Sequence, residues 1–521
     1  MATPGIGLLP LTGSNGIDAL TNGTYWNLDP SRTITWALAN FGSQSWPNPS
    51  ATAASITQAF NTFSYFAHIN FRYTGHYPDP NTANADMVFS LDGTGTIFSS
   101  ANTWALGYFP NSQLTQALLP PSLRAVYTNA PGDIWMNLSS FSAVTASYTP
   151  GAAGFYVLLH EIGHTLGLKH PHDNGGTGHP TFNDVGGSLL DIDAATIMSY
   201  NETNPLSALS LHPASPMILD VIALQSIYGA NLATNAGDTR HMLTNTGVFQ
   251  TFFDPSGSDY VDASTSQYGW NINLGIVEQS GGLPFSIGVA EPRDGAATST
   301  TLDWLYGSFE GVMGSGYADA ITGSSANEWF AGWGGNDNIT GGTGTDYAVF
   351  YRNRSDFTVT RNTAGMTVNA RAGNEGSDSL SGIERLKFQD QYLAFDTEGT
   401  AGQAYRLYQA AFDRKPDNGG LGSWIGWLDQ GNALRDAAAF FQTTPEFISK
   451  YGSNVPVSSF VTLLYQNVLH RAPDAGGMST WTTVLGSNQW SRADVLLGFS
   501  ESAENKAALI GVMQNGMEFT V

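Results

Sequence analysis

The segment from His160 to His170 carries the side chains best suited to metal chemistry. It reads HEIGHTLGLKH and contains every fixed residue of the pattern H-E-x-x-H-x-x-G-x-x-H. His160 and His164 are four residues apart, so on a helix both imidazoles project from one face. Gly167 lets the helix end and the chain turn back, which brings His170 round as a third ligand. Three neutral imidazoles leave one zinc position open, so the pattern predicts a catalytic zinc site in which Glu161 activates a metal-bound water.

This elongated motif resembles that of the metzincin zinc endopeptidases, and the variant HEIGHTLGLKHP is similar to the serralysins. The sequence IMSY, which ends at Tyr200, resembles their Met-turn. The resemblance implies that Met198 lies beneath the zinc ligands and that Tyr200 also reaches the zinc. Without it, Met198 would be a core residue and Tyr200 a half-buried aromatic. His172 and His179 lie close to the motif in sequence and are open candidates for lining the site.

Further similarity at ADMVFS, GDIWMN and MILDVIALQSIYGAN extends the resemblance over most of residues 25–231. It implies an endopeptidase with one catalytic Zn²⁺ that hydrolyses peptide bonds by Glu161-assisted attack of zinc-bound water. Tyr200 would donate a hydrogen bond to the oxyanion. A segment that resembles the edge strand above a metzincin cleft would bind an extended peptide as an added strand. Its expected substrate-binding residues are Trp104, Ala105, Leu106 and Gly107.

Four consecutive nine-residue units begin at Gly314, and their pattern is that of the RTX repeat, G-G-x-G-x-D-x-U-x. Glycine turns and a sixth-position acid near carbonyl oxygens form an oxygen cage suited to Ca²⁺. The alternative is an acidic, glycine-rich loop. The exact nine-residue spacing of the four units disfavours it. Glu328 replaces aspartate in the second unit and is a weaker candidate. The expected calcium ligands, which would bind several ions, are Asp319, Asp337, Asp346, Gly332, Gly334, Gly341 and Gly344.

Residues 400–515 contain an internal duplication with an offset of 57 residues around the sequence R-x-P-D-x-G-G. The simplest account is two copies of one helical unit. The duplicated unit resembles a bacterial domain of unknown function that occurs on secreted and surface-layer-associated proteins. This resemblance implies attachment to a surface layer, a glycan or a substrate. Trp424, Trp427 and Trp481 are expected to be core anchors rather than ligand platforms.

Composition limits the classes of partner and compartment. The 521 residues include 43 acidic and 20 basic side chains, for a net charge of −23, which disfavours binding to nucleic acid or anionic lipid. Cysteine is absent, so disulfides and thiolate metal sites are excluded. No apolar run is long enough for a transmembrane helix. The first residues do not resemble a secretory signal peptide.

The elements that must position these residues suggest a multidomain protein. Strands are expected near residues 33–39, 87–91 and 103–109, and helices near 51–69, 155–168 and 216–228. We therefore predict an α+β metzincin catalytic domain over residues 1–230, a parallel β-roll or β-sandwich RTX domain over 231–398, and an all-α domain over 399–521.

The resemblance to serralysins implies export by a type I secretion system with a carboxy-terminal signal, and an extracellular or cell-surface location. An alternative is a surface adhesion or structural protein with a vestigial protease domain, which the intact Glu161 disfavours. A third possibility, a narrow processor of one surface protein, differs only in substrate. Residue types alone do not separate it from a general protease.

Overall fold

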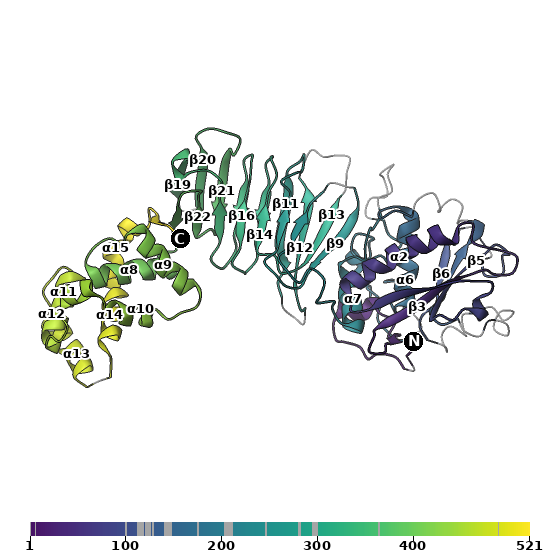
Figure 1. Ribbon diagram of the computed structural model, residues 1–521, viewed down its shortest axis with the longest axis horizontal. Coiled ribbons are helices and arrows are strands. Elements are labelled where there is room, and N and C mark those ends of the chain that lie inside the picture. Colours follow the sequence, from purple (N-terminus) through teal and green to yellow (C-terminus); the bar gives the residue numbers. More distant parts are fainter. Residues whose placement is uncertain are drawn as a thin grey trace. The chain divides into compact units, whose positions relative to one another are not determined.

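The structure is a computed structural model of the chain (Figure 1). It describes all residues except 1, 6, 99, 101, 112–118, 120–126, 128–129, 140–147, 175–176, 203–211, 245–246, 280–282, 294–300, 363–364 and 488. The chain forms two compact units, Met1–Gly311 and Val312–Val521, which we describe separately. No helix among the residues described has the length and apolar character needed to cross a bilayer.

A five-stranded sheet organises the amino-terminal half of the first unit, in the order β4-β3-β5-β7-β6. Four of its strands are parallel, and β6 is antiparallel to β7 at the edge. All six side chains of β5 are buried, as expected for a central parallel strand. The strands are β3 (Thr33–Ala39), β4 (Asn70–Tyr77), β5 (Met87–Asp92), β6 (Ala105–Gly107) and β7 (Ile134–Asn137).

Helices α2 (Pro49–Phe66) and α6 (Ala153–Thr165) contribute apolar faces to the core formed with this sheet. The side chain of Asn48 caps α2 by accepting from the backbone N–H of Ala51, and Pro49 occupies the first turn. The predicted helices and strands of this region are therefore confirmed, with ends shifted by a few residues. The smaller elements are β1 (Thr3–Pro4), α1 (Asn15–Leu20), β2 (Trp26–Asn27), η1 (Pro80–Thr82), η2 (Ser188–Leu190) and α7 (Ile218–Tyr228).

Among the described residues, the rest of the first unit, from Arg240 to Gly307, contains only β-strands as regular elements. Strands β11, β12 and β13 form an antiparallel meander, and β9 pairs with β13 in parallel. Strand β10 pairs with β8 in parallel. Their bounds are β8 (Arg240–Met242), β9 (Phe249–Asp254), β10 (Tyr260–Asp262), β11 (Trp270–Val277), β12 (Ser286–Pro292) and β13 (Leu302–Gly307).

Strand β14 precedes the nine-residue repeats of the second unit, and the strands β15 to β18 that follow each end one repeat. Alternate repeats supply alternate sheets, so β15 pairs in parallel with β17, and β16 pairs in parallel with β18. Strands β21 and β22 continue the two parallel series. The strands are β14 (Gly311–Met313), β15 (Ala320–Thr322), β16 (Trp329–Ala331), β17 (Asn338–Thr340), β18 (Tyr347–Val349), β19 (Phe357–Asn362), β20 (Gly365–Ala370), β21 (Ser377–Ser381), β22 (Arg385–Lys387) and β23 (Tyr392–Ala394), with η3 at Arg354–Asp356.

Eight helices follow among the residues described, and the chain then returns as β24 (Met517–Phe519), which pairs with β23. The first copy of the duplication comprises α8 to α11 and the second α12 to α15. Trp424, Trp427 and Trp481 pack against the apolar clusters of this region. The helices are α8 (Thr400–Phe412), α9 (Asn418–Asp429), α10 (Leu434–Phe441), α11 (Pro445–Tyr451), α12 (Val457–Asn467), α13 (Ala475–Gly486), α14 (Arg492–Ser500) and α15 (Ala503–Met513).

Equivalent ion pairs occur in the two copies of the helical unit. Arg414 pairs with Glu446 at 2.6 Å, and Arg471 pairs with Glu504 at 2.7 Å. The sequence pattern predicts that each arginine braces the aspartate of its own turn. Those contacts are present but longer, at 3.8 Å for Asp417 and 3.4 Å for Asp474. The glutamates of the following helices are therefore the nearer partners.

Candidate metal centre

The turn after α6 brings the predicted third histidine back toward the helix. Helix α6 ends at Thr165, and Gly167 has a φ of +100°. A Cβ at Gly167 would lie 2.2 Å from the carbonyl oxygen of Thr24, so a larger residue would not fit. The sequence argument for a glycine at this bend therefore has a direct steric basis.

Three imidazole nitrogens converge at this bend. The Nε2 atom of His170 lies 3.1 Å from that of His160 and 3.0 Å from that of His164. All three residues belong to one cluster of candidate metal ligands. His160 and His164 are buried, and His170 is partly exposed. The predicted metal set is thus brought together by the fold.

Each imidazole is oriented through its other nitrogen. The Nδ1 atom of His160 lies 2.7 Å from the carbonyl oxygen of Ile197, and that of His164 lies 2.9 Å from the carbonyl oxygen of Leu168. Because a carbonyl only accepts, both Nδ1 atoms must donate, so each neutral ring presents an Nε2 lone pair to the cluster. Burial lowers the pKa of His160 to about 3 and that of His164 well below its usual value. Both rings are therefore neutral near pH 7.

Converging lone pairs repel one another unless a cation lies between them. Imidazole nitrogens about 2.0–2.1 Å from a tetrahedral zinc ion lie about 3.3 Å apart, close to the observed spacing. The donor set of three neutral imidazoles also matches the nitrogen ligands that Zn²⁺ prefers. These residues therefore fit the ion that the sequence pattern implies.

Glu161 lies beside this cluster and does not belong to it. It is buried, and its Oε2 accepts a hydrogen bond from the backbone N–H of Gly107 on β6. Burial raises the pKa of the carboxyl group to about 8. A Cβ at Gly107 would lie 2.5 Å from the carbonyl oxygen of Glu161, so the close approach of β6 to α6 requires glycine. Gly107 was expected to bind substrate, and its observed contact is with Glu161.

The predicted Met-turn, residues 197–200, packs against α6 and contacts His160 and His170. Met198 is fully buried, and a Cβ at Gly163 of α6 would lie 2.6 Å from its sulfur, so the thioether packs directly under the helix. The hydroxyl of Tyr200 lies 2.7 Å from the Nε2 of His170, while its side chain is 64% exposed. Tyr200 is therefore within reach of the metal centre and open to solvent.

Three of the predicted substrate residues, Ala105–Gly107, form the outermost strand of the sheet, β6, and Trp104 immediately precedes it. Ala105 and Gly107 are buried, whereas Leu106 and Trp104 are exposed. Strand β6 pairs with β7 on one side and ends the strand order on the other. This position suits the addition of a further strand.

Two carboxylates at the site were missed at the sequence level. Asp173 lies 2.7 Å from the Nδ1 of His170, and Asp220 of α7 accepts from the backbone N–H of Ile197 at 2.7 Å. Asp173 follows the motif closely, so its three-residue separation from His170 was a usable signal. Asp220 had no local signal, because its partner is 23 positions away.

The two histidines left open in sequence have different environments. The ring of His172 lies 5.2 Å from those of both His170 and Tyr200, so it borders the site. His179 is buried 3.3 Å from the Thr21 hydroxyl and does not join the cluster of ligands.

The acids of the nine-residue repeats form ladders in the second unit. The backbone N–H of Asp319 donates to Asp337 at 2.8 Å, and that of Glu328 donates to Asp346 at 2.9 Å. Glu328 is buried like the aspartates and occupies the corresponding position, although its departure from aspartate predicts a weaker ligand. The Oδ2 atoms of Asp337 and Asp346 are buried and have no hydrogen-bond partner among the residues described.

Two further acids extend the ladders. The backbone N–H groups of Asp337 and Asp346 donate to Asp378 at 3.1 Å and to Glu384 at 3.0 Å. The β19–β20 hairpin separates these acids from the regular repeats, so the nine-residue phase did not reveal them.

The predicted glycines lie against these carboxylates or against the neighbouring turn. A Cβ at Gly332 would lie 2.1 Å from the Oδ2 of Asp337, and one at Gly341 would lie 2.6 Å from that of Asp346. Gly344 has a φ of +127° and faces the Ala326 carbonyl oxygen, and a Cβ at Gly334 would lie 3.2 Å from the Asn374 carbonyl oxygen. Side chains at Gly332 and Gly341 would thus collide with the ladder carboxylates, and one at Gly344 would collide with the neighbouring turn, which explains glycine at these three positions.

Comparison with known proteins agrees with this geometry. A family described as matrixin matches residues 25–199, and a domain of unknown function, DUF4214, matches residues 437–509. Metallopeptidase AprA of Pseudomonas marginalis is 34% identical over 182 residues, covering 29% of this chain and 38% of the relative. Serralysin C of Dickeya chrysanthemi is 36% identical over 156 residues, covering 26% and 32% respectively. A serralysin of Photorhabdus luminescens is 26% identical over 274 residues, covering 49% and 51%.

The chain thus spans between about a third and a half of the curated relatives it matches. The matched region contains the three converging histidines, Glu161 and Met198. Residues 25–199 thus match the matrixin family and are similar to serralysins, and a separate match to a domain of unknown function lies at residues 437–509.

Proposed function

We propose that this protein is a secreted, zinc-dependent endopeptidase that hydrolyses peptide bonds in proteins. The observation that carries the proposal is the convergence of three imidazole Nε2 atoms at 3.0–3.1 Å beside the buried carboxylate of Glu161. When bound, Zn²⁺ supplies Lewis-acid polarisation of the scissile carbonyl and lowers the pKa of water.

Glu161 moves the proton. Its Oε2 is held by the N–H of Gly107, so we assign Oε1 to proton transfer. The carboxylate takes a proton from the attacking water and then delivers it to the leaving amine. Burial raises its pKa to about 8, which favours the protonated form that exists between these two transfers.

Strand β6 orients the peptide. An extended substrate adds antiparallel to this edge through backbone hydrogen bonds, with side chains placed against exposed Trp104 and Leu106. The hydroxyl of Tyr200, which lies 2.7 Å from His170, donates to the oxyanion that develops on the carbonyl. The intact position of Glu161 supports an enzyme over a surface protein with a vestigial protease domain.

Calcium would stabilise the second unit as a parallel β-roll. The unpartnered Oδ2 atoms of Asp337 and Asp346 are oxygen ligands of the kind that Ca²⁺ prefers. Burial of closely spaced carboxylates raises the pKa of Asp337 to about 9 and that of Asp346 to about 7. A divalent cation would relieve this repulsion, and external calcium would then couple binding to folding after export. Residues 1–230, 231–398 and 399–521 would act as the catalytic, calcium-binding and helical domains.

Export and attachment follow from the similarity to serralysins and from the helical addition. We propose passage through a type I secretion system, and attachment of residues 399–521 to a cell-surface layer or glycan. Mapping of cleavage sites in a whole secreted proteome would separate broad digestion from processing of a single surface protein.

The central test compares casein hydrolysis by the wild type, Glu161→Gln and the matched control Glu278→Gln, which lies outside the matrixin domain. Glu161→Gln should retain zinc, measured by metal analysis, and lose activity by about 10²-fold or more, because it cannot accept the proton. The control should match the wild type. Zinc-loaded Glu161→Gln with activity within tenfold of wild type would refute the proposed role of Glu161.

A further inference from the structure

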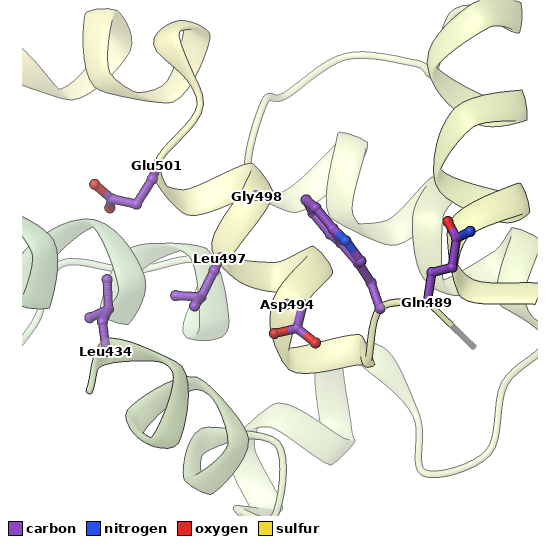
Figure 2. A pocket seen from close by; sticks show the side chains of 7 residues that line it. Leu434, Gln489, Asp494, Leu497, Gly498 and Glu501 are labelled. Carbon is purple, nitrogen blue, oxygen red and sulfur yellow. The ribbon is translucent and has the colours of Figure 1, made fainter. Parts of the chain in front are cut away.

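The helical part of the second unit contains a pocket of about 440 Å³. It lies between α10 of the first copy and α14 of the second, and Figure 2 shows Leu434 on the α10 side facing Leu497 and Asp494 on α14. Its volume lies within the range of about 300–1,000 Å³ typical of small-molecule sites. The lining residues are Leu434, Gln489, Trp490, Asp494, Leu497, Gly498 and Glu501.

The two copies differ where this pocket forms. The segment between α13 and α14, residues 487–491, is one residue longer than the segment between α9 and α10, residues 430–433. The longer segment carries Trp490, whose side chain is 44% exposed. Insertion of an exposed tryptophan beside a hollow is not required by the helical framework, because the first copy lacks it.

A glycine keeps the hollow open on α14. In the first copy, Phe440 covers Trp424 with ring centroids 5.5 Å apart. The corresponding residue of the second copy is Gly498, where a Cβ would lie 2.6 Å from the ring of Trp481. In this copy the ring of Trp490 lies beside that of Trp481 instead, with centroids 5.7 Å apart. The second copy has thus lost one covering side chain and gained an aromatic surface at the rim.

The two carboxylates that line the pocket are each already paired with an arginine. Asp494 pairs with Arg435 at 2.5 Å, and Glu501 pairs with Arg406 at 2.5 Å. Gln489 adds an amide that both donates and accepts. A ligand would therefore meet carboxylate oxygens that accept hydrogen bonds but whose negative charge is balanced by arginines. Such a pocket offers little electrostatic attraction to a charged ligand. Anions are disfavoured further by the net charge of −23.

We propose that this pocket binds a neutral saccharide, with one pyranose ring stacked on Trp490. A pyranose presents an apolar C–H face, which suits an aromatic ring, and hydroxyl donors at its edge, which suit the carboxylates of Asp494 and Glu501. The inference rests on the proposed attachment role of residues 399–521 and gives it a location and a ligand class. It is independent of peptide hydrolysis.

Binding can be tested on the 521-residue chain loaded with calcium and zinc. Tryptophan fluorescence and calorimetry would be recorded against glucose, N-acetylglucosamine, rhamnose and short oligosaccharides of each, with choline as a cationic probe. We expect saturable binding of at least one neutral saccharide at millimolar concentration. Trp490→Ala should weaken it at least tenfold, and Gln489→Ala at least threefold.

The matched control is Phe440→Ala, which removes a 56% exposed aromatic at the related position of the first copy and should leave binding unchanged. Thermal unfolding of each variant reports whether the helical fold is retained. Failure of every saccharide to bind, equal binding by folded Trp490→Ala, or preferential binding of choline would overturn the inference. Casein hydrolysis measured in parallel shows separately whether the protease proposal holds.

Discussion

Asp220 of α7 connects the Met-turn to the metal centre, and its replacement tests how the site is positioned. Its Oδ2 accepts from the N–H groups of Ile197 at 2.7 Å and Met217 at 2.9 Å, and its Oδ1 accepts from the hydroxyl of Thr196 at 2.6 Å. The carbonyl of Ile197 in turn accepts from the Nδ1 of His160. Asp220 is thus two hydrogen bonds away from a zinc ligand.

The contrast between Asp220→Ala and Asp220→Asn isolates these hydrogen bonds. Asparagine can accept from both backbone N–H groups through Oδ1 and donate to Thr196 through Nδ2, whereas alanine leaves three buried donors without an acceptor. At about 1 kcal/mol for each donor, the alanine variant should be about 3 kcal/mol less stable than the asparagine variant. For a domain of this size, that difference corresponds to a melting temperature about 6–12 °C lower.

Calorimetry of the full chain with calcium and zinc would measure this difference, and chelator competition would measure zinc retention. We expect Asp220→Ala to lose zinc about 10- to 100-fold more readily than Asp220→Asn, because His160 is no longer held in orientation. Equal melting temperatures and equal zinc retention in the two variants would show that Asp220 does not position the site.

The wild type and Asp220→Asn should also differ in pH dependence. Burial raises the pKa of Asp220 from its ordinary value to about 7. Because the pKa is higher in the folded state, the contribution of Asp220 to the free energy of unfolding is greatest below about pH 4. It falls as the pH rises from about 4 to about 7. The asparagine variant should therefore gain stability relative to the wild type between pH 4 and 7, by an amount on the order of 4 kcal/mol. A difference that does not vary with pH would contradict the buried, ionisable state assigned to Asp220.

Three further perturbations have definite expected outcomes. Lys169→Met should lower the melting temperature by several degrees, because the buried Nζ donates to three backbone carbonyls at 2.5–2.9 Å, and an unchanged calorimetric transition would contradict this. Tyr200→Phe should lower kcat about 10- to 100-fold with little change in KM if the hydroxyl acts on the oxyanion, whereas a rise in KM alone would assign it to substrate binding. Removal of calcium with EGTA should lower the melting transition of the second unit by exposing the repulsion around Asp337, and magnesium should not restore it; insensitivity to EGTA would argue against calcium in the ladders.

The sequence alone predicted the positions of those functional residues that are set by a short, regular spacing along the chain. Helical spacing places His160 and His164 on one face, and glycine at position 167 permits the bend that returns His170. The nine-residue phase likewise places the acids of the four repeats in the ladders, because each repeat contributes one turn and one short strand, whereas Asp378 and Glu384 lie outside that phase. In these cases neighbouring residues constrain the backbone strongly enough for position in the chain to determine position in space.

Tertiary structure decided the contacts between distant segments. Gly107 holds Glu161 across 54 positions, and Asp220 holds the Met-turn across 23, with no periodic signal linking either pair. The pocket beside Trp490 depends on the packing of α10 against α14, which arise from different copies of the duplication. Such contacts are selected by how whole elements pack, since many pairings satisfy the same local pattern and only burial and steric fit discriminate among them.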